Sequence, residues 1–158
     1  MFLVHLGPGR FGGLGVRLSM TEQDKAVYEA LSYYTLAHGD PAFIHQHVVD
    51  AFAAQHATEH SKPITVAFAL VGLYLYIEKG FSGREVQQAH MRLAKRRREW
   101  PRFFFPADRG AVSVHDVMRA EPGRERDHVI EAWCASVWST YSRARDQIAA
   151  LVRSELDR

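Results

Sequence analysis

Cysteine and long apolar runs are both scarce in this chain of 158 residues. Its one cysteine, Cys134, excludes a disulfide framework within the chain and a zinc site built from several thiolates. A single free thiol also suits a reducing compartment. The longest apolar run, residues 66–77, is shorter than the roughly 20 residues that a membrane-spanning helix needs. We therefore expect a soluble, cytoplasmic protein with no membrane partner.

A surplus of one charge is also missing. Lysine and arginine number 20 against 18 aspartate and glutamate residues, for a formal net charge of +2. This balance does not by itself indicate a polyanionic partner. Hydrophobic residues make up 47% of the chain and charged residues 24%, which excludes a disordered or low-complexity protein. The length is that of one domain able to bury its own core.

The first eighteen residues differ from the rest. Gly7, Gly9 and Gly12 spell the G-x-G-x-x-G pattern of nucleotide-binding loops, but more glycines follow where a helix would have to begin. No alternation of strands and helices follows either. We expect a flexible N-terminal extension over residues 1–18 and a helical bundle domain over residues 19–158.

Apolar residues recur at helical spacing through the remaining sequence, between helix-starting and helix-ending signals. Two S-x-x-E capping boxes, Ser19 to Glu22 and Ser82 to Glu85, predict helix starts. The fold class expected is all-α, a single-domain bundle of about five helices around a central apolar helix. The helices are expected over residues 20–37, 41–57, 64–79, 83–99, 113–120 (a short one) and 124–155.

Nine histidines, several of them close together in the chain, mark the region where chemistry is expected. If neighbouring helices run antiparallel through short loops, one end of the bundle gathers histidines from two helices and acidic residues beside them. Imidazole and carboxylate on facing helices are the ligands of zinc or iron sites in bundles. We predict a divalent metal such as Zn or Fe, supporting hydrolytic or oxidative chemistry. The predicted ligands are His45, His47, Asp50 and His90, with His56 and Glu78 as further candidates.

Two other roles for these histidines stay open. Each could be a core residue with its own hydrogen bond, since His45 and His47 point in nearly opposite directions on a helix. Metal-free acid–base chemistry would instead need a histidine with a shifted pKa beside a carboxylate, such as His47 with Asp50. No catalytic residue can be assigned from the sequence alone, and whether the protein is an enzyme stays open.

Residues 45–56 read H-x4-D-A-F-x2-Q-H and are followed by an apolar helix that ends in Glu78 before Gly80. This pattern resembles that of an uncharacterised bacterial all-helical family of unknown function. The resemblance implies the fold and points to His45, Asp50, Gln55 and His56, but it implies no reaction. Some members of that family also carry an N-terminal C-x-x-C pair and a histidine in the apolar helix. This chain has neither, which weakens a zinc-based function.

A different class of function also fits the sequence. A non-catalytic interaction module could bind a protein or nucleic acid through the basic run at residues 95–98 or the aromatic residues 103–105. The basic run is short and the net charge small, which argues against nucleic acid. A homo-oligomer stays open.

Overall fold

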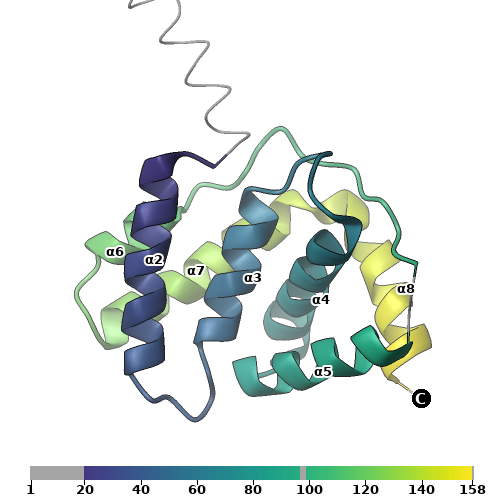
Figure 1. Ribbon diagram of the computed structural model, residues 1–158, viewed down its shortest axis with the longest axis horizontal. Helices are drawn as coiled ribbons and strands as arrows, with labels where there is room; N and C mark the ends of the chain where they lie inside the picture. The colour runs from purple at the N-terminus through teal and green to yellow at the C-terminus, as the bar shows by residue number, and fades with distance from the viewer. Residues whose placement is uncertain (1–19, 97–98, 158) are drawn as a thin grey trace, which may run out of the picture.

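The structure, a computed structural model, describes residues 20–96 and 99–157. Over these residues the chain forms α-helices and one 3-10 turn, with no strand, which confirms the all-α class (Figure 1). The expected flexible extension, residues 1–18, lies outside the described part. The helices are α2 (Glu22–Ala37), α3 (His45–Gln55), α4 (Pro63–Lys79), α5 (Gly83–Arg96), α6 (Val114–Arg119), α7 (Arg124–Thr140), η1 (Ser142–Ala144) and α8 (Arg145–Leu156).

The start of α2 differs from the expectation. Its N-cap is Thr21, whose Oγ1 accepts a hydrogen bond from the Asp24 backbone N–H, while the Asp24 carboxylate accepts one from the Thr21 N–H. The capping box therefore involves Thr21 and Asp24 in place of Ser19 and Glu22. The box predicted at Ser82 and Glu85 is confirmed, since each residue's side chain accepts from the other's backbone N–H.

The expected number of about five helices is wrong, since the described residues form seven α-helices. The predicted long last helix is broken at Tyr141, where the chain makes the short turn η1 before α8 begins. Tyr141 is buried, and its hydroxyl donates to the Ala54 carbonyl oxygen on α3 at 2.6 Å. The break thus lets one aromatic residue anchor α7 to α3 while α8 turns away to pack on α4 and α5.

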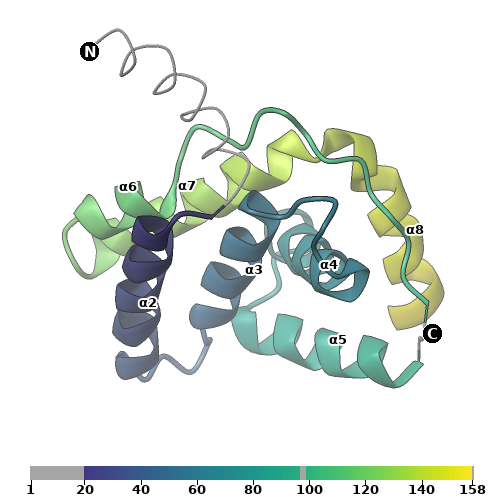
Figure 2. The same ribbon diagram turned by 45° about the horizontal axis from the view of Figure 1, so that its top comes forward.

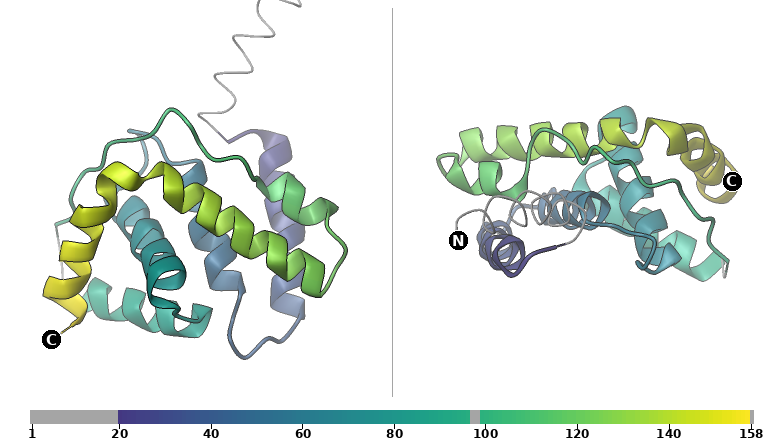
Figure 3. Two further views of the ribbon diagram at one scale, coloured as in Figure 1. Left: turned by 180° about the vertical axis from the view of Figure 1, so that it is seen from behind. Right: turned by 90° about the horizontal axis from the view of Figure 1, so that it is seen from above.

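The helices are arranged so that the most apolar one, α4, packs against α3, α5, α7 and α8 (Figure 2). Helix α7 crosses α3 and α4 on one side, and the view from behind shows it running across both (Figure 3). Helix α2 joins the bundle through α3 and α6. No helix of the described part is long and apolar enough to cross a membrane.

A long irregular segment, residues 99–113, connects α5 to α6 and crosses the molecule past the C-terminal end of α3 (Figures 1 and 2). Two polar side chains fasten it. Gln55 donates to the carbonyl oxygens of Arg109 and Val112 at 2.9 and 2.8 Å, and the Ser136 hydroxyl accepts from the Ala111 N–H at 2.8 Å. This segment forms one wall of the cavity described below.

Candidate functional site

The histidines predicted as metal ligands each have a separate environment. His45 Nδ1 lies 2.8 Å from the Thr35 hydroxyl, and His90 Nε2 lies 2.8 Å from the Phe68 carbonyl oxygen. The His47 ring stacks on Tyr76 with the ring centroids 3.5 Å apart. His45 and His90 thus each have a hydrogen-bond partner, as the structural alternative expects, whereas His47 Nδ1 is buried without one.

Asp50, the carboxylate of the predicted set, is enclosed in the core. Its Oδ1 accepts from Gln46 Nε2 at 3.1 Å, and its Oδ2 is buried without a hydrogen-bond partner. The carboxyl group lies against Gly72 of α4, where a Cβ atom would fall 1.9 Å from Oδ2. Burial raises the pKa of Asp50 well above its usual value, and the Gln46 hydrogen bond opposes that shift only in part.

The metal centre predicted at His45, His47, Asp50 and His90 has no support in the part of the chain that the structure describes. The described residues contain no group of three or more His, Cys, Asp or Glu side chains placed to hold a metal ion. Burial lowers the pKa of both His47 and His90 to about 4, so both rings are neutral at pH 7. Glu78 is held by Arg145 and by the Trp138 indole N–H, which donates at 2.7 Å. His45 contacts Thr35 of α2, whereas His47, Asp50 and His90 each contact a different residue of α4, namely Tyr76, Gly72 and Phe68.

A different carboxylate lies between two imidazoles, where the start of α2 meets the end of α3 and the start of α6. Asp24 Oδ1 lies 2.7 Å from His115 Nε2, and Asp24 Oδ2 lies 3.7 Å from His56 Nε2. Because an ionised carboxylate only accepts hydrogen bonds, His115 carries its proton on Nε2. All three side chains are partly shielded, with exposed fractions of 17% for Asp24, 12% for His56 and 28% for His115.

The tautomer of His56 follows from its other nitrogen. His56 Nδ1 lies 3.0 Å from the Phe52 carbonyl oxygen, which can only accept, so the neutral ring carries its proton on Nδ1. Nε2 is then an unprotonated nitrogen that faces Asp24. Burial lowers the pKa of His56; the Phe52 carbonyl and the Asp24 carboxylate act in the opposite direction but do not cancel the effect. At neutral pH this ring is therefore a neutral base.

Asp24 is ionised at this position. Its burial alone would raise the pKa of the carboxyl group, but the hydrogen bonds from Thr21 and His115 and the nearby His56 outweigh burial and lower the pKa. The Asp24 carboxylate thus has two roles, since it caps the N-terminus of α2 and also pairs with the imidazoles. An aspartate at the third helical position is favoured there by the helix dipole as well.

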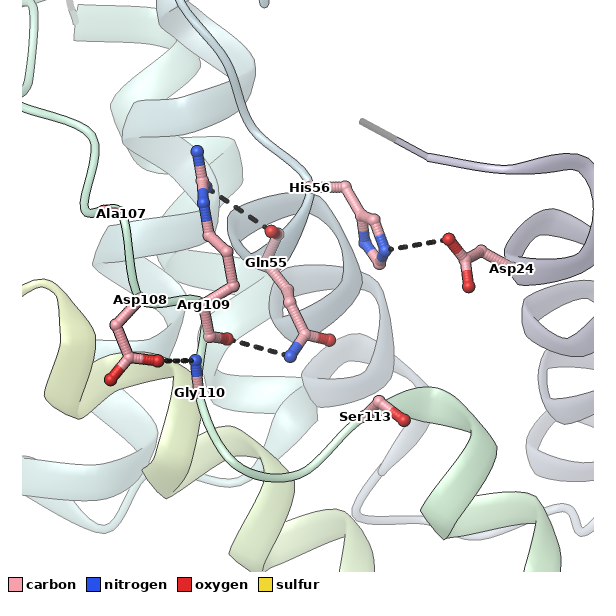
Figure 4. A pocket seen from close by; sticks show the side chains of 8 residues that line it. All are labelled: Asp24, Gln55, His56, Ala107, Asp108, Arg109, Gly110 and Ser113. Carbon is pink, nitrogen blue, oxygen red and sulfur yellow. Dashed lines mark hydrogen bonds and ion pairs between the residues drawn. The ribbon is translucent and has the colours of Figure 1, made fainter. Parts of the chain in front are cut away.

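Asp24 and His56 border a cavity of about 370 Å³ (Figure 4). In the close-up the His56 ring points toward Asp24 across the cavity from Arg109. Arg109 Nη1 donates to the Gln55 carbonyl oxygen and to the Tyr141 hydroxyl, both at 3.4 Å, and its Nε is buried without a partner. None of the ion pairs among the described residues involves this guanidinium. The lining residues are Asp24, Gln55, His56, Ala107, Asp108, Arg109, Gly110 and Ser113.

Within the motif at residues 45–56, some side chains hold the fold together and one lines the cavity. Gln55 accepts from the Trp133 indole N–H at 2.9 Å while its amide donates to the 99–113 segment, so it holds α3, α7 and the segment together. Asp50 and Ala51 are buried in the core. His56, which the sequence placed among the secondary candidates, is the one histidine of the motif that lines this cavity.

Three residues of the site were missed by the sequence reasoning: Asp24, Arg109 and His115. They lie on α2, the irregular segment and α6, and nothing in their local sequence indicates that they meet at the end of α3. The T-x-x-D and S-x-x-D capping patterns could have shown that Asp24 and Asp116 start helices, but only the fold places His115 against Asp24.

The surfaces predicted for an interaction module are only partly described. Lys95 and Arg96 are exposed at the end of α5, while residues 97 and 98 lie outside the described part. In the aromatic run, Phe103 is buried in the core, whereas Phe104 is 57% exposed and has the Arg143 guanidinium 3.9 Å from its ring centroid. The aromatic residues thus contribute mainly to packing.

The fold and the site together define an all-helical protein with a polar cavity that contains a carboxylate flanked by two imidazoles and faced by an arginine. The chain belongs to the Family of unknown function (DUF5946), which it matches over residues 20–142. The matched region includes all of the cavity-lining residues. Neither the curated proteins nor the solved structures contain a match to the chain.

Proposed function

We propose that this protein is a hydrolase that cleaves an ester bond by general-base catalysis in the cavity beside His56. The observation that supports this function best is the unprotonated His56 Nε2. Because the proton of the neutral ring stays on Nδ1, where it is donated to the Phe52 carbonyl, Nε2 is a free base beside an ionised carboxylate. A neutral histidine with a lowered pKa is a suitable general base at neutral pH.

In the proposed reaction His56 Nε2 takes a proton from a water molecule, and the water oxygen forms a bond to the ester carbonyl carbon. The carbonyl electron pair moves to oxygen, and the resulting oxyanion is stabilised by the Arg109 guanidinium, which has no carboxylate partner within residues 20–96 and 99–157. When the oxyanion collapses, the bond to the alcohol oxygen breaks and the leaving alkoxide takes the proton back from His56. The products are a carboxylic acid and an alcohol.

Asp24 and His115 are positioning residues in this proposal. The Asp24 carboxylate favours the protonated form of His56, which exists only while the reaction proceeds. His115 donates to the other oxygen of the same carboxylate and fixes its orientation. Other sites also pair an aspartate with a catalytic histidine, but here the carboxylate faces Nε2, the same nitrogen that acts as the base.

Hydrolysis of para-nitrophenyl acetate by the full chain tests the proposal. In His56→Asn the shorter amide can still donate to the Phe52 carbonyl but offers no base, so we expect the rate above buffer to fall about 100-fold or more. The matched control is His60→Asn, because the His60 side chain is 88% exposed four residues away and can react with this ester only as a surface imidazole.

A rate that His56→Asn leaves unchanged, or that falls equally in His60→Asn, would contradict the proposal. Circular dichroism of both variants must show the helical content of the unaltered chain. A folded His56→Asn protein with undiminished turnover would assign the His56 contacts to stability alone.

A further inference from the structure

A second cavity of about 400 Å³ lies between the start of α2, the end of α3 and the start of α4. Its walls are mainly apolar and include Tyr28, Val49, Phe52, Ala53, Ala57 and Val66. Lys25 and Glu29 are the charged residues along it, both on the exposed side of α2. The groove thus offers a mostly apolar surface whose charged residues stand on one side.

This groove and the polar cavity share one residue, because His56 lines both. A row of rings leads from the groove to it: Tyr28 stacks on Phe52 with centroids 4.1 Å apart, and Phe52 lies 4.3 Å from the His56 ring. Cavities of about 300 to 1,000 Å³ with apolar walls and a few converging polar groups are the usual form of small-molecule sites. Taken together, the two cavities have that size and that division of chemistry.

We infer that the substrate is the ester of a straight-chain carboxylic acid, with its alkyl chain along Phe52 in the groove and its ester group at His56. This inference rests on the proposed function and adds the substrate class. The carbonyl oxygen would then face Arg109, and the carboxylate product would pair with the same guanidinium. A polar substrate without an alkyl chain would leave the groove unused.

Chain length should therefore control affinity. Full burial of one methylene corresponds to about a fourfold gain in affinity, and the open side of the groove reduces this to about twofold. We expect Kd to fall by about that factor per added methylene from butanoate to octanoate. Octanol, which has the alkyl chain but no negative charge, should bind more weakly than octanoate, and Arg109→Gln should abolish that difference.

Binding and turnover of the same chain-length series, both measured in the full chain, test the inferred substrate class. Binding of acetate, butanoate, hexanoate and octanoate is measured by NMR titration below the concentration at which the acids form micelles, and kcat/KM is measured for the matching para-nitrophenyl esters. The test variant is Ala53→Leu, which fills the half-buried groove wall without touching the polar cavity. The control is Ala150→Leu on the exposed side of α8, which lines neither cavity.

The inference predicts that Ala53→Leu abolishes the gain with chain length in both measurements and leaves acetate unchanged, while Ala150→Leu changes neither. Kd values independent of chain length, or an unaltered series in Ala53→Leu, would overturn it. A groove occupied by residues 1–19 or by a second copy of the chain would give such a flat series. Hydrolysis of the acetate ester that depends on His56, together with a flat series, would leave the proposed function standing. Binding that depends on chain length without turnover would refute the hydrolase alone.

Discussion

Two carboxylates with histidines beside them lie in opposite surroundings, one at the middle of α3 and one at its C-terminal end. Asp50, three residues after the stacked ring of His47, is enclosed against Gly72 with one oxygen unpartnered, and burial raises its pKa. Asp24, beside the His56 that follows α3, accepts hydrogen bonds at both oxygens, and these lower its pKa. The pair of residue types is the same, but only Asp24 combines a lowered pKa with a place beside a cavity.

The number of hydrogen-bond donors around each carboxylate therefore decides which of the two can take part in chemistry. A buried carboxyl group with a single donor, such as Asp50 with Gln46, favours its neutral form, since a charged group is costly to remove from water. The Asp50 region should therefore respond to substitution through stability, and the Asp24 region through activity. Changes in stability and activity should separate the core around Asp50 and His90 from the polar region around Asp24, and they are given from the largest expected effect to the smallest.

Gly72→Ala should have the largest effect on stability. The new methyl would overlap the Asp50 carboxyl group, since its Cβ would lie 1.9 Å from Oδ2, so we expect a loss of about 3 kcal/mol or more in the free energy of unfolding. Urea denaturation measures the loss. Asp50→Ala in the same chain removes the overlapping group, and the double variant should be more stable than Gly72→Ala alone; strictly additive losses would contradict the described packing.

Acid should destabilise the fold through its neutral core histidines. In the folded chain His90 has a pKa of about 4 against the ordinary 6.5, so the unfolded chain takes up a proton first as the pH falls. Stability is fully present above pH 6.5 and declines toward pH 4, by about 3 kcal/mol for this residue. Urea denaturation across that window should show a smaller decline in His90→Gln, whose amide can still donate to Phe68. An equal decline in both proteins would refute this assignment.

Asp50→Asn should stabilise the protein at neutral pH. Because the folded pKa of Asp50 is raised, its contribution to stability is complete below pH 3.8 and is lost as the pH rises through the folded value. Asparagine resembles the neutral acid and can still accept from Gln46, so we expect a gain of about 1 to 2 kcal/mol in the free energy of unfolding. Thermal denaturation at pH 7 compares the two proteins. A lower melting temperature in the variant would show that the carboxylate is stabilising there.

His56→Asn should have the smallest effect on stability, within about 0.5 kcal/mol, although it removes the proposed base. The amide keeps the hydrogen bond to the Phe52 carbonyl that fixes the ring. Urea denaturation of this variant and of His60→Asn should give nearly equal midpoints. A large loss confined to His56→Asn would make the polar region structural, like the core around Asp50, and would remove the contrast between them.

Sequence patterns were sufficient for most of the fold, because capping boxes and apolar periodicity are local. Helices α4, α5 and α6 were predicted to within a few residues, whereas the break at Tyr141 was missed because it depends on a tertiary contact with Ala54. The candidate site was predicted only through His56. Asp24, Arg109 and His115 are separated by up to 91 residues, and their proximity follows from the packing of α2 on α6, which no local pattern encodes.

The most direct test of the central claim is the pKa of His56, measured by NMR titration of its imidazole in the unaltered chain, in Asp24→Asn and in Arg109→Gln. The structure predicts a value below 6.5 in the unaltered chain. Asp24 raises this pKa and Arg109 lowers it, so Asp24→Asn should lower it further and Arg109→Gln should raise it. A pKa at or above 6.5 that neither substitution moves would contradict the claim that His56 is a neutral base held between the carboxylate and the guanidinium.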